Sequence, residues 1–290
     1  MASILADFNG RFTVDTKEWD PFVDGRILLN ETQLVLAASE DDKLAVPLDS
    51  IFDISVGSLP SAFDPIPGTP AVVAFEQGNK RLVAAIAGKE DQIEKFSVVL
   101  YKAILNGTPI TLNHPAKVGG RVMDTNFEGS LLSLQAGGVV FDTAEGPLNI
   151  PLNAIVDFSR EKRAVEGMDR PVLVVSHVDN GEALTTLAAT ESPRKLSILG
   201  RYLQRRYQTV LESLSELSLS SLETETLTTL YTAGGAGVSV TSVLDIAPKQ
   251  AKQLLHALHE KGLIQSGDDG PVLTAKGQIV VNQYLERVNE

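Results

Sequence analysis

The 290-residue chain contains no cysteine and only one tryptophan. The absence of cysteine excludes disulfide bonds and thiolate chemistry, so any zinc site would need histidine and carboxylate ligands. No apolar run approaches the roughly 18 residues that a membrane-spanning helix requires. The first residues, MASILADFNGRF, lack a basic stretch followed by an apolar one. We therefore expect no signal peptide and a cytoplasmic protein.

Basic residues are also scarce, since 25 Lys and Arg face 37 Asp and Glu, for a formal net charge of −12. Residues 1–115 hold 9 basic and 16 acidic groups, residues 116–217 hold 11 and 13, and residues 218–290 hold 5 and 8. Nucleic acids and anionic membranes both require Lys and Arg to neutralise phosphates. The sequence therefore predicts neither nucleic acid nor membrane lipid as a partner.

One stretch of the chain occurs twice. Residues 25–53 read GRILLNETQLVLAASEDDKLAVPLDSIFD, and residues 129–157 read GSLLSLQAGGVVFDTAEGPLNIPLNAIVD. The offset is 104 residues throughout, with no insertion. The matching pairs are Gly25 and Gly129, Val35 and Val139, Val46 and Ile150, Pro47 and Pro151, Leu48 and Leu152, Ile51 and Ile155, and Asp53 and Asp157. The repetition predicts two copies of one domain.

Each copy is predicted to be an antiparallel sheet closed by one amphipathic helix. Short apolar stretches separated by polar turns are typical of such a sheet, and a leading strand or arm with Phe8, Phe12, Val14 and Trp19 is expected to pack on the first copy. The strands expected in the first copy span residues 25–30, 33–38, 43–48, 51–56, 70–76 and 81–87, with a loop at 57–69. A helix is expected at 89–105.

The second copy repeats this ending. Strands are expected at residues 171–178 and 183–189, and a helix begins at Pro193 after the capping residue Ser192. Residues 218–290 have no counterpart in either copy. Helices at 222–233, 240–244 and 248–261, two short strands around residues 267–270 and a last helix indicate a winged helix-turn-helix.

The helix at 248–261 would be the recognition helix if this module bound DNA. It carries Lys249 and Lys252, but Asp268 and Asp269 in the wing would repel phosphates. A winged helix that binds protein fits these charges better.

Several local patterns resemble parts of catalytic or metal sites. His256 and His259 could present two metal ligands on one helix, but no carboxylate pair completes a site, so no metal and no cofactor is expected. His114 and His177 are interpreted as structural.

Three further patterns also have structural interpretations. Ser192-Pro193-Arg194-Lys195 matches the S-x-x-K pattern, but its serine suits a helix cap. The glycine-rich loop of Gly234, Gly235 and Gly237 lacks the Lys-Ser/Thr of a phosphate loop. Asp53 and Asp157 are expected to close strands and cap turns. We expect no catalytic residues and no enzyme.

Charge alone marks candidates for binding an acidic partner. Arg201 and Arg205 share a helical face at i, i+4, and arginine grips carboxylates well; the cluster at residues 160–163 is the other basic group. The alternative is an ordinary solvated face. The candidate partner-binding residues are Arg194, Arg201, Arg205, Arg206, Lys249 and Lys252.

The repeated unit, GRILLNETQLVLA followed by VPLDSI, resembles the pleckstrin-homology-like (PH-like) architecture. The expected fold class is therefore α+β, with two tandem PH-like antiparallel sheet-plus-helix domains at residues 1–112 and 113–217. A winged helix-turn-helix domain follows at residues 218–290. The sequence does not predict the oligomeric state.

These stretches together with HPAKVGG at residues 114–120, RPVLVV at 170–175 and the C-terminal winged helix are similar to the archaeal chemotaxis adaptor CheF family. The resemblance implies a non-enzymatic adaptor that links the response regulator CheY, preferentially phosphorylated, to archaellum components of the FlaCE and FlaD type and so controls the sense of rotation. It implies recruitment to the base of the archaellum.

The alternatives are a winged-helix transcription regulator with PH-like sensor or dimerisation domains, and a PH-like lipid binder. A lipid binder would need basic residues where the chain has Asn30, Glu31, Thr32 and Gln33.

Overall fold

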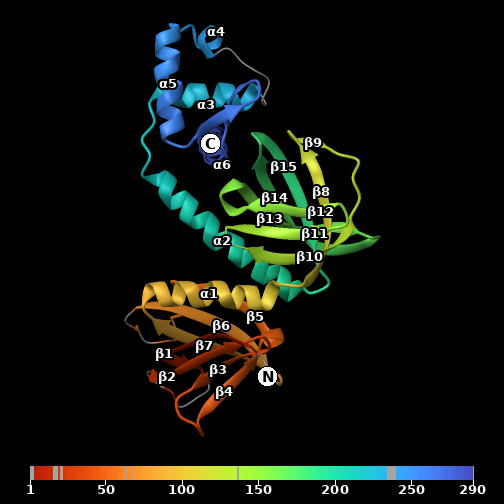
Figure 1. The fold of residues 1–290 in the computed structure, drawn as a ribbon, viewed down its shortest axis with the longest axis vertical. Helices are drawn as coiled ribbons and strands as arrows, with labels where there is room; N and C mark the ends of the chain where they lie inside the picture. The colour runs from red at the N-terminus through yellow and green to blue at the C-terminus, as the bar shows by residue number, and fades with distance from the viewer. Residues whose placement is uncertain are drawn as a thin grey trace. The chain divides into compact units, whose positions relative to one another are not determined.

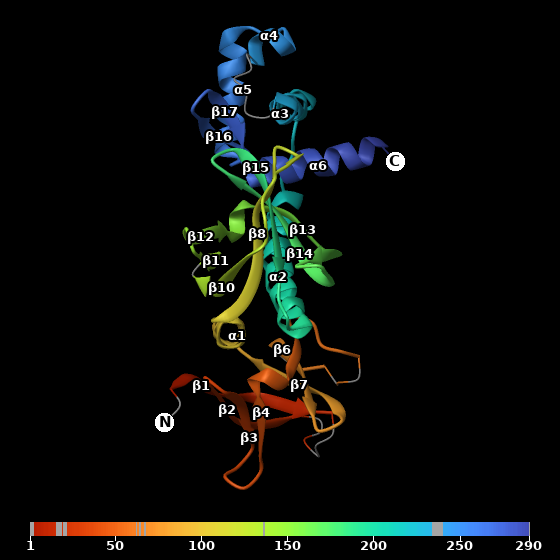
Figure 2. The ribbon, with the colours of Figure 1, turned by 90° about the vertical axis from the view of Figure 1, so that its right-hand side faces the viewer.

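The protein is α+β, with largely antiparallel sheets and several helices, as the sequence predicts (Figures 1 and 2). The structure is a computed structural model that describes residues 3–15, 19, 22–61, 63, 65–66, 68–135, 137–233 and 240–289. The chain divides into two compact units. Unit 1 comprises Met1–Thr108, Leu131–Leu134 and Thr190–Tyr202; unit 2 comprises Pro109–Ser130, Gln135–Ala189 and Leu203–Glu290.

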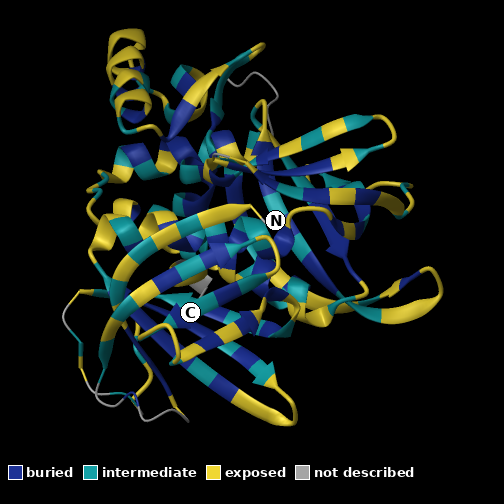
Figure 3. Ribbon diagram, turned by 60° about the horizontal axis from the view of Figure 1, so that its bottom comes forward, coloured by how far each residue is buried: buried dark blue, intermediate teal, exposed yellow. Residues whose placement is uncertain are grey.

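The first sheet has seven antiparallel strands in the order β4-β3-β2-β1-β7-β6-β5. They are β1 (Ile4–Val14), β2 (Val23–Asn30), β3 (Gln33–Ala37), β4 (Lys43–Pro47), β5 (Ile51–Val56), β6 (Thr69–Gln77) and β7 (Lys80–Gly88). Every strand expected for this copy is present. The strands alternate between buried and exposed positions, as in β4, so one face lies on a core (Figure 3).

The leading strand β1 lies inside the sheet, where it pairs with β2 on one side and β7 on the other. Phe12, Val14 and Trp19 are buried, as expected. The Trp19 ring packs edge-on against Phe12, and its indole N–H donates to a carboxylate oxygen of Asp42. The first residues are therefore part of the core of unit 1. The loop at 57–69 is only partly among the described residues.

Helix α1 (Glu90–Leu105) closes the first sheet. Its buried residues Ile93, Phe96, Leu100 and Ile104 recur at helical spacing, and the helix packs on β1, β6, β7 and the short 3-10 helix η1 (Leu48–Ser50). Such a helix covers the apolar face that a small open sheet would otherwise expose.

The second sheet repeats this topology, in the order β12-β11-β10-β8-β15-β14-β13. Its strands are β8 (Thr108–Val118), β10 (Glu128–Gln135), β11 (Gly138–Thr143), β12 (Gly146–Pro151), β13 (Ile155–Val165), β14 (Met168–Asp179) and β15 (Glu182–Ala189), with β9 (Arg121–Val122) paired to β8. The 104-residue offset holds at β1 and β8, and at η1 and η2 (Leu152–Ala154). Strand β8 was not among the strands expected from the sequence.

The remaining elements follow in the predicted order. They are α2 (Pro193–Ser215), α3 (Ser221–Ala233), α4 (Val240–Leu244), α5 (Pro248–Glu260), the hairpin of β16 (Ile264–Gly267) and β17 (Gly270–Leu273), and α6 (Ala275–Asn289). Helix α2 belongs to unit 1 as far as Tyr202 and to unit 2 from Leu203. The glycine-rich loop of Gly234, Gly235 and Gly237 lies outside the described residues.

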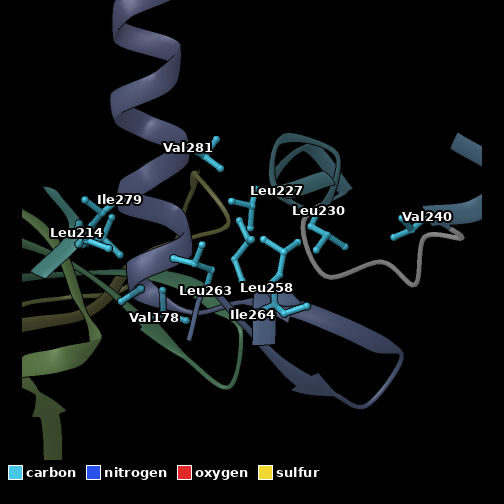
Figure 4. Packing of buried hydrophobic residues seen from close by; sticks show 13 residues of the cluster. Val178, Leu214, Leu227, Leu230, Val240, Leu258, Leu263, Ile264, Ile279 and Val281 are labelled. Atoms are coloured by element: carbon cyan, nitrogen blue, oxygen red, sulfur yellow. The ribbon is translucent and has the colours of Figure 1, made fainter. Parts of the chain in front are cut away.

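One hydrophobic cluster joins these C-terminal elements to the second sheet within unit 2. Leu227 and Leu258 are fully buried in it, and Val156, Val178 and Leu214 bring in β13, β14 and α2 (Figure 4). An ion pair fixes the entry to α3, because Lys261 Nζ lies 2.6 Å from Glu223 Oε1. The C-terminal elements therefore share a core with the second sheet, while a smaller cluster that includes Val165 and Val172 lies apart from it in unit 2.

Gly25 and its counterpart Gly129 have different packing roles in the two copies. A Cβ at Gly25 would collide with the carbonyl oxygen of Ala37 and lie 2.8 Å from the Phe12 ring, whereas a Cβ at Gly129 would meet nothing within 4 Å. We predict that Gly25→Ala lowers the free energy of unfolding by about 1–3 kcal/mol through overpacking. Urea denaturation measures this change.

The matched control is Gly129→Ala, which we expect to change the free energy of unfolding by at most about 1 kcal/mol, because alanine is the better residue inside a strand. Equal losses in the two variants would contradict the packing argument.

Candidate functional site

Two of the candidate arginines form ion pairs within unit 1. Arg201 Nε lies 3.0 Å from Asp53 Oδ1, and its Nη2 lies 3.2 Å from Oδ2, a two-point contact. Arg194 Nη2 lies 2.5 Å from Glu76 Oε2. The side chains are partly exposed, so each pair adds at most about 1 kcal/mol. The structure thus gives Arg194 and Arg201 roles inside the chain.

The expected role of Asp53 and Asp157 as strand-closing turn caps is wrong. Asp53 lies near the start of β5 and Asp157 near the start of β13, each just after an irregularity in the strand register. Such a bulge turns a side chain out of the regular alternation. The Asp53 carboxylate is therefore directed at Arg201. Asp157 lies in unit 2, whereas Arg201 belongs to unit 1.

Ser192 has the capping role predicted for it. Its Oγ accepts a hydrogen bond from the backbone N–H of Lys195 at 3.4 Å, at the start of α2. Lys195 Nζ donates to Thr108 Oγ1 at 3.2 Å, so the S-x-x-K pattern has a structural explanation. Arg205 and Arg206 are half-buried further along this helix, in unit 2.

Helix α5 presents an exposed polar face. Lys249, Lys252, His256 and His259 are exposed, whereas Ala251, Leu254 and Leu258 on the other side are buried. No group of three or more His, Asp or Glu side chains that could hold a metal ion occurs among the described residues. The face therefore offers two ammonium groups to a binding partner, and the helix is held rigidly by the cluster beneath it.

The two isolated histidines of the sequence meet in the second sheet. His114 of β8 and His177 of β14 stack with ring centroids 5.7 Å apart. His114 Nδ1 lies 2.7 Å from Thr186 Oγ1, and His177 Nε2 lies 3.0 Å from the same oxygen. A hydroxyl both donates and accepts, so Thr186 can satisfy both rings while they are neutral.

Burial is the main influence on the charge of this pair. The pKa of His177 is lowered to about 4, mainly by burial and to a smaller extent by His114, while Asp179 opposes the shift. Burial also lowers the pKa of His114, and Asp179 again opposes it. Near neutral pH both rings are uncharged and act as packing and hydrogen-bonding groups. The structural interpretation of both histidines fits this geometry.

A cavity of about 650 Å³ opens beside His114. It is bordered by Asp124, Glu128 and Glu145, and Thr125 Oγ1 on its wall donates to Asn113 Oδ1. His114 and Pro115 of the HPAKVGG stretch form part of its wall, and the rest comes mainly from the loop after β9 and the β11–β12 turn, so no local sequence pattern marks this cavity.

The sequence as a whole matches one protein family. The family described as CheF-arch, archaeal chemotaxis signal transduction system protein F, matches residues 4–209. The chain is also 33% identical over 287 residues to taxis protein CheF2 of Halobacterium salinarum, covering 99% of both chains. The chain belongs to the CheF family. It therefore has a role in archaeal chemotaxis signalling, as its resemblance to this family predicts.

A second relative of this CheF-family chain is taxis protein CheF1 of Halobacterium salinarum, which is 28% identical over 195 residues, or 65% of this chain and 66% of the relative. Among solved structures, the C-terminal domain of an unknown protein from Leishmania infantum is 15% identical and covers 36% of this chain and 85% of its own, with a TM-score of 0.26. Among the described residues, no helix is long and apolar enough to cross a membrane.

We predict that acid destabilises the fold through His177. Its pKa is lower in the folded state than in the unfolded state, so the unfolded chain binds more protons between about pH 4 and 6.5, and stability falls as the pH falls through that range. Between pH 7 and 4.5 this costs about 2–3 kcal/mol. Urea denaturation at both pH values measures the loss.

The comparison variant is His177→Gln, which keeps a group able to hydrogen-bond Thr186 but does not titrate. Its loss of stability between the two pH values should be smaller than that of the wild type by this amount. An unchanged pH dependence in His177→Gln would show that the acid sensitivity arises elsewhere.

Proposed function

We propose that the protein is a non-enzymatic adaptor of archaeal taxis signalling. It links the response regulator CheY, preferentially phosphorylated, to the motor or switch components of the archaellum and so controls the sense of rotation. The observation that carries the proposal is the similarity to taxis protein CheF2 along 99% of the chain, which covers the C-terminal elements as well as both repeats. Its place of action is the cytoplasm, at the base of the archaellum.

We also propose a division of the chain into three domains. The strand order that the two sheets share, with helix α1 packed on the first of them, supports two PH-like domains at residues 1–112 and 113–217. Three helices, a hairpin and a last helix support a winged-helix domain at residues 218–290. Folds of both kinds are binding scaffolds whose function lies in their surfaces.

The α5 face is the surface we assign to CheY. Lys249 and Lys252 are exposed on a helix that the cluster beneath it holds in place, so the backbone that carries them loses little freedom on binding. An acidic partner surface would complement them. Arg205 and Arg206 are the secondary candidates, and Arg194 and Arg201 contribute less because they already hold carboxylates of unit 1.

The wing supports protein over DNA as the partner of this face. Asp268 and Asp269 are exposed in the turn between β16 and β17. In a winged helix that binds DNA, the wing approaches the phosphate backbone, and two carboxylates there would oppose binding. Archaellum components of the FlaCE and FlaD type are the second set of partners, and signalling requires that phosphorylation of CheY changes its affinity for the adaptor.

We predict that CheY binds the full-length chain more tightly with the phosphate mimic beryllium fluoride than without it, as measured by isothermal titration calorimetry at cytoplasmic salt. The double variant Lys249→Glu, Lys252→Glu should weaken binding by about tenfold or more, because it replaces two attractive contacts with repulsive ones. A matched control is Lys43→Glu, an exposed lysine on β4 of unit 1.

Equal weakening by Lys43→Glu would show a general charge effect and remove the α5 face from the proposal. No binding of CheY in either state, together with salt-sensitive binding of duplex DNA, would instead support the transcription regulator.

A further inference from the structure

A groove of about 570 Å³ lies in unit 2 between strand β13 and helix α6. Its apolar wall is made by Val156, Ile279, Leu285 and the ring of Tyr207. Two carboxylates, Asp157 and Glu286, border it, and both are exposed to solvent. The volume lies within the range of pockets that hold small ligands or single side chains.

Asp157 in this groove can be compared with Asp53, which occupies the equivalent position in the first copy. Asp157 is the counterpart of Asp53, with the same 104-residue offset and the same irregularity of register just before it. In the first copy, the carboxylate receives the Nε and Nη2 groups of Arg201. In the second copy, the helix that packs on the equivalent strand is α6, and it contributes Glu286.

The negative charge of the groove is not matched within the part of the chain that the structure describes. No described ion pair involves Asp157 or Glu286, and no Lys or Arg lines the groove. Arg287 follows Glu286 but donates its Nε to the carbonyl oxygen of Gln283. Burial is the main cause that raises the pKa of Tyr207, and the negative charges of Asp157 and Glu286 raise it further.

We propose that this groove binds an arginine side chain presented by a protein partner, in the way that Asp53 binds Arg201 within the chain. A guanidinium carries five donors in a planar fork, which suits two separated carboxylates, and it stacks on an aromatic ring such as Tyr207. The apolar wall accommodates the methylene stem. A lysine side chain would match the negative charge of the groove, but its ammonium group lacks the planar set of donors. Two carboxylates are too few ligands for a metal site.

The inference does not rest on which protein the adaptor binds, so it can be tested without CheY. The probe is the peptide acetyl-Gly-Arg-Gly-amide, titrated into the full-length protein labelled with ¹³C at isoleucine methyl groups. Ile279 lies in the groove wall and reports directly on occupancy. We expect a saturable shift of the Ile279 signal, with about tenfold weaker binding of the citrulline peptide, which has the same shape without the charge.

The variants Asp157→Asn and Glu286→Gln should each weaken binding of the arginine peptide about threefold to tenfold. Both side chains are exposed, so neither substitution threatens the fold. The control is Asp142→Asn, which removes an exposed carboxylate from β11 of the same sheet outside the groove and should leave binding unchanged.

Other occupants give distinguishable results that overturn the proposal. Equal binding of a lysine peptide would make the groove a general cation site, and a response to Mg²⁺ alone would make it a metal site. Shifts of Ile279 that grow with protein concentration without peptide would identify a second copy of the chain as the occupant. The absence of any saturable shift would show that the groove binds no arginine.

Discussion

The cluster that contains Leu227, Leu258 and Leu263 holds the C-terminal helices to the second sheet in unit 2, because buried side chains of α3, α5 and α6 pack in it together with Val156 and Val178 of that sheet. Fully burying a leucine stabilises a fold by about 1.5–3 kcal/mol, so several such residues outweigh the surface ion pairs of the chain. Helix α6 owes its position on β13 to this cluster, and helix α5 owes to it the direction of its exposed lysines. The groove beside α6 and the exposed face of α5 therefore both depend on this apolar cluster.

The two copies share one backbone arrangement, and they differ in the charged groups around the repeated aspartate. The strand order is the same in both sheets, and the short helices η1 and η2 keep the 104-residue offset. The first copy satisfies its repeated aspartate with Arg201, whereas the second places Asp157 near Glu286. The same backbone position is thus an internal anchor in one copy and an accessible negative site in the other.

The elements of this fold could be predicted because their signals are local. Period-two apolar stretches give the strands, Ser192-Pro193 gives the start of α2, and the constant offset gives the repeat. The site could be predicted only in part. Charge alone marks Lys249 and Lys252 as candidates; the structure places both on an exposed helix face, and their binding role stays a prediction.

The contacts that the sequence could not predict join residues far apart in the chain. The bond between Arg201 and Asp53 spans 148 residues, and that between His114 and Thr186 spans 72. No local pattern marks such pairs. The bulges that redirect Asp53 and Asp157 depend on how neighbouring strands pair, which also lies beyond a local pattern.

An adaptor must hold two partners at the same time, and sedimentation velocity of the full-length chain with phosphorylated CheY and a FlaCE- or FlaD-type archaellum component tests this most directly. We predict a species with the mass of all three proteins, in which neither partner displaces the other. This species should disappear when CheY is omitted or dephosphorylated. Displacement of one partner by the other would contradict the adaptor function, because it would show that both compete for one surface.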